Sequence, residues 1–246
     1  MQIKKTILVF TVCIFNSSCA VLEADRNNLV IDDPFEQFNR KTHTFNKTVD
    51  TVALMPAAQL YGNLVPQYFR LGAASFYGNL QEPKRFANHL AQGQFLKASI
   101  DFRRFILNTT IGLLGIFDTA SWLKFFPEET SFDETFAYWN IPNGPYFETP
   151  FLGPGSLRGS FGLFADYTVN PLLMLPGPVS SLSFATFEIV NVINSRYEYA
   201  HAIDSLLYKS SDSYASSRLT YLQKSKNIAQ TQEEIPFELF DPSEEF

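Results

Sequence analysis

Cysteine is nearly absent from this chain, and the little there is lies near the N-terminus. The two cysteines are Cys13, inside an apolar run, and Cys19, directly after Ser17 and Ser18. A cleaved signal would remove Cys13, and a modified Cys19 would offer no free thiol. We therefore expect a mature chain with neither a disulfide nor a reactive thiol, which excludes a fold held together by disulfide bonds.

Charged residues are also scarce. They make up 18% of the chain, whereas a typical soluble domain carries about a quarter. Aromatic residues make up 15%, and 25 residues are phenylalanine. Few charges together with many aromatics indicate a surface that faces lipid or another protein. An ordinary large aromatic core is the alternative that composition leaves open.

Positive charge is the scarcer of the two signs. The formal net charge is −6, and loss of Lys4 and Lys5 with a signal would leave 17 of the 19 basic side chains against 25 acidic ones, a net charge of −8. Such a chain is repelled by nucleic acid and gains little from anionic headgroups. We expect no nucleic-acid partner, and we expect any membrane attachment to be hydrophobic.

The motifs of common enzyme classes are missing. The chain has no phosphate-binding P-loop, and Ser156 lies among glycines without the G-x-S-x-G pattern of a nucleophile elbow. His43, His89 and His201 are scattered, without the spacing of metal ligands. His43 falls on a predicted polar helix face, where we expect it to be solvated. The sequence predicts no enzymatic activity, no cofactor and no metal.

Alternation of apolar and polar residues is absent over any useful length, and no Ser/Gly linker divides the chain. We therefore predict a single all-α domain. Helical spacing of apolar residues predicts helices from Pro34 to about Val52, between Gly93 and Asn108, and from about Ser181 to Leu207. Pro34 suits a first helical turn, and Asp33 is the expected cap.

No segment has the pattern of a membrane-spanning helix. Residues 167–187 contain no charge, but Pro171, Pro176, Gly177 and Pro178 interrupt them. The freed backbone groups could not be satisfied in lipid. We expect two short helical pieces that lie in one leaflet or pack inside the protein.

The two ends differ from the middle. Residues 1–18 combine Lys4 and Lys5 with a short apolar run and are predicted to be a signal peptide. Cys19 follows two small residues, so we predict that it is lipidated and that residues 19–32 form a tether. A cleaved signal with a free cysteine is the alternative, because Asn16 is unusual in a lipidation signal. Residues 33–228 form the predicted helical domain, and residues 229–246 an acidic, disordered tail.

A loop rich in proline and glycine runs from residue 143 to residue 158. Its turn-forming residues hold the aromatic ones on an irregular, stiff segment. Two interpretations are open: the loop packs over its own core, or it lies at membrane depth and acts as a gate. The gate would comprise Gly144, Pro145, Tyr146, Pro150 and Phe151.

Several ordered blocks resemble one known family. The 143–158 loop is similar to a G-P-Y-x-x-x-P-F-x-G-P-x-S-x-R signature, and residues 33–40 resemble an opening D-P-x-E-x-F-N-R block. Residues 79–93, 104–120 and 212–223 resemble further blocks in the same order. On these motifs the chain resembles the VacJ/MlaA family of bacterial outer-membrane lipoproteins. It departs from the family at residues 139–143, where a glycine-rich run is expected, and at Gly159, where an acid is expected.

The resemblance implies a ring of amphipathic helices, seated in the inner leaflet of the outer membrane of a Gram-negative bacterium, around an amphipathic channel for misplaced phospholipids. It also implies two partners, a porin trimer and a soluble periplasmic lipid carrier. A structural or virulence-associated envelope lipoprotein without transport activity is the alternative. The polar side chains that we expect along the channel and at the lipid headgroup are Asn39, Arg40, Asn46, Arg104, Asn108 and Arg158.

The arginines in that set have two possible roles. A guanidinium can bind a phosphate with two parallel hydrogen bonds. It can equally pair with an acid and hold helices together, and for Arg104 or Arg158 that acid would be Asp118, Asp101 or another one.

Overall fold

The computed structural model describes residues 33–170 and 178–233. The predicted signal peptide, Cys19 and the 19–32 tether therefore lie outside the described residues, as does the tail beyond residue 233. Described residues contain helices and no strand, only two isolated bridges, Tyr146 to Ser156 and Thr149 to Gly153. The all-α prediction is confirmed.

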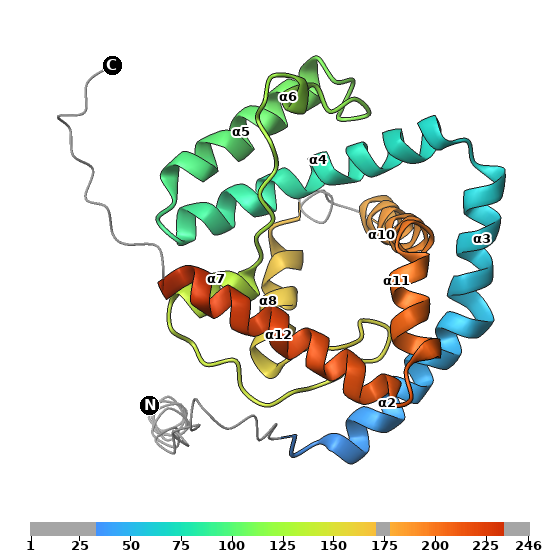
Figure 1. Ribbon diagram of the computed structural model, residues 1–246. Helices are drawn as coiled ribbons and strands as arrows, with labels where there is room; N and C mark the ends of the chain where they lie inside the picture. Colours follow the sequence, from blue (N-terminus) through green and yellow to red (C-terminus); the bar gives the residue numbers. More distant parts are fainter. Residues whose placement is uncertain (1–32, 171–177, 234–246) are drawn as a thin grey trace, which may run out of the picture. The chain divides into compact units, whose positions relative to one another are not determined.

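The described part begins with three consecutive helical segments, α2, η1 and α3, and continues with the antiparallel pair α4 and α5 (Figure 1). Short helices α6, α7 and α8 follow, and α10, α11, η2 and α12 complete the described part. The bounds are α2 Glu36–Val49, η1 Asp50–Leu54, α3 Met55–Leu64, α4 Gln67–Ala91, α5 Phe95–Thr110, α6 Thr119–Trp122, α7 Phe132–Tyr138, α8 Leu157–Thr168, α10 Pro178–Glu198, α11 Ala200–Asp204, η2 Ser205–Lys209 and α12 Ser213–Glu233.

The packing brings segments distant in sequence together. α10 lies against α3 and α4, α12 lies against η2 and α7, and α7 packs on α8. The contact between α3 and α10 is close because a Cβ at Gly62 would overlap the ring of Tyr197. In Figure 1 α3 lies at the right, between α2 at the lower right and α4 across the top, and α12 lies on the opposite side from α4.

The helices are amphipathic with their polar faces turned inward. On α5, Ala98, Asp101, Arg104 and Asn108 are buried. The apolar residues between them are exposed: Phe95 72%, Leu96 75%, Phe102 55% and Ile106 44%. Spacings of three and four residues put each set on one face of the helix. The predicted periodicity is confirmed, but this apolar face does not point to a core.

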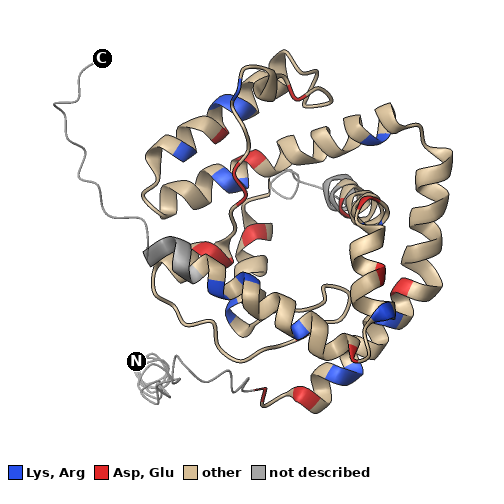
Figure 2. Ribbon diagram, viewed as in Figure 1, with Lys and Arg blue, Asp and Glu red and all other residues tan. Residues whose placement is uncertain are grey.

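This inversion holds across the described residues. Their buried apolar side chains are Ala58, Ala98, Ala120, Tyr146 and Tyr214, and the other buried side chains, glycines apart, are polar or charged. Figure 2 shows the same division: α3 and the first half of α4 are almost free of charge, and charged residues gather on α2, α12 and the α4–α5 pair. The alternative of an ordinary aromatic core is therefore wrong.

The first helix differs from its prediction. Asp33 does not cap α2, which begins after Phe35 without a side-chain cap. The Asp33 carboxylate instead accepts hydrogen bonds from Asn39 (2.9 Å), Arg218 (2.9 Å) and the Tyr214 hydroxyl. Helical structure continues without a break through η1 into α3 and ends at Leu64. The local sequence pattern predicted that Asp33 caps α2. In the structure Asp33 instead joins the start of α2 to α12.

Two further boundaries can be compared. α12 continues to Glu233, so the domain boundary predicted at residue 228 falls inside a helix. In the uncharged 167–187 segment, α8 ends at Thr168 and α10 begins at Pro178, and residues 171–177 lie outside the described part. None of the helices within the described ranges is long and apolar enough to cross a membrane.

Candidate functional site

Two adjoining cavities lie between α2, η1, α10 and the 143–158 loop. The first, here called the His43 cavity, measures about 380 Å³ and also reaches η2 and α12. The second, the Phe151 cavity, measures about 440 Å³ and also reaches α3 and α8. Asn46, Asp50, Leu54 and Val192 line both, and the walls of both are mainly apolar. The two cavities are thus neighbours that share part of their walls, and both walls combine apolar surface with polar side chains.

One face of α2 fastens the loop to the helix. Asn39, His43 and Asn46 follow at spacings of four and three residues, which places them on the same side of a helix. Asn39 donates to the Tyr146 carbonyl (3.2 Å) and accepts from the Glu148 amide (3.0 Å). His43 Nδ1 lies 3.1 Å from the Glu148 carboxylate. A single helix face therefore fixes the middle of the loop.

Asn46 completes this attachment. Its amide nitrogen donates to Glu148 and to the Thr149 carbonyl, both at 3.1 Å, and its oxygen accepts from the Phe151 amide at 2.8 Å. The side chain thus uses both its donor and its acceptor on the loop. Asn46 is the predicted headgroup residue that lines both cavities.

Glu148 is the single acid of the 143–158 loop, and it is only 1% exposed. It accepts from His43, Asn46 and the Tyr146 hydroxyl (3.3 Å). Burial, with the neighbouring carboxylate of Glu148, raises the pKa of the Tyr146 hydroxyl, which therefore remains a donor. The prediction that His43 is solvated is wrong, because its ring is buried against Glu148 and Ser213.

His43 also connects the loop to α12. Its Nε2 lies 3.0 Å from the hydroxyl of Ser213, while Nδ1 faces Glu148. The order hydroxyl, imidazole, carboxylate is the order found in serine hydrolases. In this chain the same three groups join α2, the loop and the first residue of α12. Sequence reasoning missed this cluster because its members are far apart in the chain.

The loop has an irregular backbone, as its composition predicts. Gly144 has a φ of 71° and Phe151 a φ of 67°. Both values lie in the left-handed region, which is costly for residues with a Cβ. Tyr146 is buried, whereas Phe151 is 75% exposed and packs edge-on against Phe45. Phe147 stacks on Phe38. The part around Tyr146 packs inward, as the first interpretation expects. The part around Phe151 lines a cavity, and its role as a gate stays a prediction.

Arg104 is at the centre of a buried polar cluster. Its guanidinium contacts Glu82 (2.7 Å), Asp118 (3.2 Å), Ser121 (3.1 Å) and the Phe125 carbonyl. Asn108, one turn along α5, donates to Asp118 and accepts from Thr119 and from the Ala120 amide. These contacts tie α5 to α4 and α6. The pairing of Arg104 with Asp118 is confirmed, whereas Asp101 pairs with His89.

The two acids of this cluster differ in their pKa. Burial is the largest influence on Glu82 and raises its pKa, although Arg85 and Arg104 oppose it. Burial also acts to raise the pKa of Asp118, but hydrogen bonds from Ser121 and Asn108 outweigh it, so the pKa is lowered overall. Asp118 is therefore the acid whose ionised form the fold favours.

The other two predicted arginines are also paired. Arg158 donates to Asp133 (2.7 Å) and to the Ile141 carbonyl (3.0 Å), so an acid on α7 replaces the one expected at Gly159. Arg40 pairs with Glu36 and Asp212. Thus Asn39, Arg40, Arg104, Asn108 and Arg158 all use their polar groups on internal contacts.

Several residues that sequence analysis did not select also line the His43 cavity. Asp50 receives both an Arg196 guanidinium (2.7 and 3.1 Å) and the Tyr208 hydroxyl (2.7 Å). Lys47 and Ser217 line the same cavity. Helical spacing from Asn39 and Asn46 places His43 and Asp50 on the same face, which is a signal that was available in the sequence.

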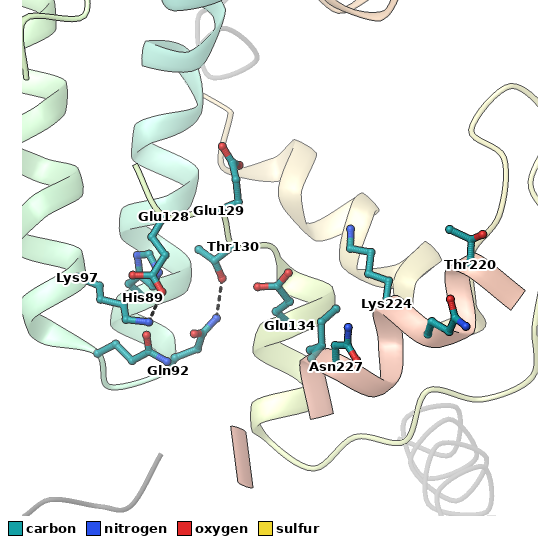
Figure 3. A pocket seen from close by; sticks show the side chains of 13 residues that line it. His89, Gln92, Lys97, Glu128, Glu129, Thr130, Glu134, Thr220, Lys224 and Asn227 are labelled. Atoms are coloured by element: carbon teal, nitrogen blue, oxygen red, sulfur yellow. Dashed lines mark hydrogen bonds and ion pairs between the residues drawn. The ribbon is translucent and has the colours of Figure 1, made fainter. Parts of the chain in front are cut away.

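A third pocket is of a different kind. It measures about 520 Å³ and lies between the ends of α4 and α5, the segment before α7, and α12 (Figure 3). Its lining is polar and partly paired: Lys97 with Glu128, and Gln92 with Thr130 at 2.9 Å. No group of histidines and acids in the described part of the chain is arranged to hold a metal ion.

Comparisons with known proteins agree with one another. Residues 31–227 match the family model described as MlaA lipoprotein. The intermembrane phospholipid transport system lipoprotein MlaA of Escherichia coli is 34% identical over 201 residues, which cover 80% of this chain and 78% of that protein. An uncharacterized protein of Rickettsia bellii is 34% identical over 187 residues, 76% of this chain and 72% of its own length.

A solved structure is similar in fold as well. It is described as a structural basis for maintenance of bacterial outer membrane lipid asymmetry, and it aligns with a TM-score of 0.68 at 33% identity. The alignment covers 80% of this chain and 99% of the solved one.

Proposed function

Because the chain belongs to the MlaA lipoprotein family, we propose that it removes mislocalised phospholipids from the outer leaflet of a Gram-negative outer membrane and passes them towards the periplasm. The observation that carries this proposal is the pair of adjoining cavities, whose walls are mainly apolar and include charged and polar side chains. A phospholipid needs a polar route for its headgroup, while its tails can remain in an apolar environment.

The surface supports a position in one leaflet. Large apolar side chains are exposed on most helices, for example Leu64 75%, Phe69 73% and Phe164 71%. Each such side chain contributes favourably when it leaves water, by about 25 cal/mol per Å². The helices would form a ring around an amphipathic channel, of which the two cavities are a part. Lipid-facing helices with polar inner faces match this environment.

The 143–158 loop is the proposed gate. Gly144 and Pro145 precede the part fastened to α2, and Phe151 lines the Phe151 cavity. The fastened part runs from Tyr146 to Phe151 and includes Pro150. Rotation at Gly144 would shift Phe151 relative to the cavity only after the contacts of Asn39, His43 and Asn46 break. The loop would then have two positions, one fastened to α2 and one released from it.

The chain is proposed to act with two proteins, an outer-membrane porin trimer beside its apolar surface and a soluble periplasmic carrier that accepts the lipid. Photocrosslinking groups placed at Leu64 and Phe69 should capture a porin in intact cells. A group at buried Ala98 serves as the control position. Capture from Ala98 alone would contradict a porin on the exposed surface.

Cys19 is the proposed lipid anchor. One acyl chain binds membranes only weakly, whereas several chains and an embedded body attach firmly. The intact mass of the mature protein tests this, because lipidation adds the mass of the acyl groups to a chain that begins at Cys19. An unmodified Cys19 would contradict it.

Transport itself is tested by blocking the cavities. Val192 lines both of them, so Val192→Trp should lower the transfer of a fluorescent phospholipid from vesicles to a soluble acceptor to a small fraction of the wild-type rate. Leu219→Trp is the matched control, because both residues are partly exposed on a helix (46% and 42%). Equal transfer by both variants would contradict passage through the cavities.

A further inference from the structure

Two cationic side chains, Lys47 and Arg196, line the His43 cavity, and their surroundings differ. Arg196 is held by Asp50 at 2.7 Å and by Asp204 at 2.6 Å. Lys47 forms no ion pair with any residue that the structure describes. Its ammonium instead lies over the ring of Tyr208, 5.2 Å from the centroid. The charge of Lys47 is therefore available to a ligand.

Other polar groups on the wall of this cavity are also available. Ser217 is 2% exposed, and its hydroxyl has no hydrogen-bond partner. Asn191 and Ser195, one turn apart on α10, line the same wall. A buried polar group without a partner costs about 1–3 kcal/mol. A ligand with acceptor oxygens in this cavity would remove that cost.

The carboxylates of the cavity do not cancel this site. Asp50 is paired with Arg196 and also accepts from Tyr208. Glu148 accepts from His43 and Asn46. Both acids thus have internal partners, whereas Lys47 has only the Tyr208 ring. The wall thus carries two cations, Lys47 and Arg196, and two carboxylates, and Lys47 is the cation without a carboxylate partner among the described residues.

We propose that Lys47 binds the phosphate of the phospholipid in the His43 cavity, and that an acyl chain extends into the adjoining Phe151 cavity. This inference rests on the proposed transport function and adds the residue that holds the headgroup. A lysine ammonium is a compact charge suited to a phosphodiester. Beyond the shared Leu54 and Val192, the Phe151 cavity offers the chain Val49, Ala53, Ile189 and Ile193.

Binding of purified full-length protein to two probes tests the assignment. The probes are a fluorescent phosphatidylglycerol and the diacylglycerol with the same chains and no phosphate. One charged hydrogen bond corresponds to about a tenfold change in affinity. Lys47→Met should therefore weaken phosphatidylglycerol binding by about tenfold and leave diacylglycerol binding unchanged, and Lys47→Arg should stay near wild type.

Controls separate the possible results. Lys41→Met removes an exposed lysine from the same helix and should change neither affinity. Lys47→Gln repeats the test if Lys47→Met does not fold. Equal phosphatidylglycerol binding by wild type and Lys47→Met overturns the role of Lys47. Competition by inorganic phosphate at millimolar concentration overturns a lipid as the ligand. Failure of the wild-type protein to bind either lipid overturns the transport proposal itself.

Discussion

Arg104 and Lys47 both occupy polar faces of helices, but the fold treats their charges in opposite ways. Arg104 is 4% exposed, and its donors are taken by Glu82, Asp118, Ser121 and a carbonyl. Lys47 has an aromatic ring for a neighbour and lines a cavity. A conspicuous arginine inside an ordered motif is thus a structural residue here. Lys47, which was not among the predicted headgroup residues, has no ion pair with any described residue.

The largest expected effect concerns Arg104. Arg104→Met removes a buried guanidinium from Glu82, which keeps only Arg85, and from Asp118. It should lower the free energy of unfolding by about 3 kcal/mol, because buried ion pairs are broken from one side. Arg103→Met is the control, since Arg103 is exposed beside it on α5 and its guanidinium lies over the Phe125 ring. Unfolding in detergent at increasing urea concentration measures both. Similar losses would mean that the buried cluster has no special role.

The next effect concerns Glu148, which fastens the loop beside the cavity. Glu148→Ala removes the partner of His43 Nδ1 and one of the two acceptors of the Asn46 amide, and should cost about 1–3 kcal/mol. Glu128→Ala removes an exposed pair with Lys97 and should cost at most about 1 kcal/mol. Thermal unfolding compares the variants, and limited proteolysis between residues 143 and 158 reports on the loop. An unchanged cleavage rate in Glu148→Ala would show that other contacts hold the loop.

Gly144 tests the proposed gate. Gly144→Arg should cost about 1–2 kcal/mol because of its positive φ, since an added Cβ would meet only Leu157 at an ordinary 3.4 Å. Gly93→Arg is matched, with a φ of 74° and open space around it. We expect similar protein levels and melting for both variants, but phospholipid in the outer leaflet only with Gly144→Arg. Normal lipid asymmetry in both rules out gating at Gly144.

A smaller effect depends on pH. The lowered pKa of Asp118 means that its ionised form stabilises the folded state above the ordinary carboxyl pKa near 3.8, and that this contribution is lost as the pH falls through the folded pKa. Stability of the wild type should therefore decrease on acidification below about pH 4. Asp118→Asn should show a weaker decrease in the same range. Identical pH profiles would place the sensitivity at other acids.

The smallest effect on stability is expected at Lys47, and it completes the comparison with Arg104. Lys47→Met removes no ion pair within the described chain, so the free energy of unfolding should change by less than about 1 kcal/mol. Lipid transfer should nevertheless decrease. Unfolding of Lys47→Met should be measured together with Arg104→Met. If Lys47→Met lowers the free energy of unfolding as much as Arg104→Met does, Lys47 is a structural residue.

Sequence alone determined the secondary-structure class and the family. The lack of period-two alternation and the three- and four-residue spacings predicted an all-α chain, and the ordered motifs indicated the family that the comparisons support. These features are local or linear, so they can be read without knowing which helices meet. The shortage of charge and the excess of phenylalanine also indicated apolar surface, which the exposed faces of α5 illustrate.

Only the tertiary structure decided which polar residues are free. Arg104, Asn108 and Arg158 were expected at a headgroup, yet their partners Asp118 and Asp133 lie 14, 10 and 25 residues away on other segments. His43 was expected in solvent, but its ring is buried beside Glu148, which is 105 residues away in the sequence. Hydrogen bonds and ion pairs depend on distances of about 3 Å between segments. A linear pattern therefore identifies the polar face of a helix, and packing determines whether each group on it is paired.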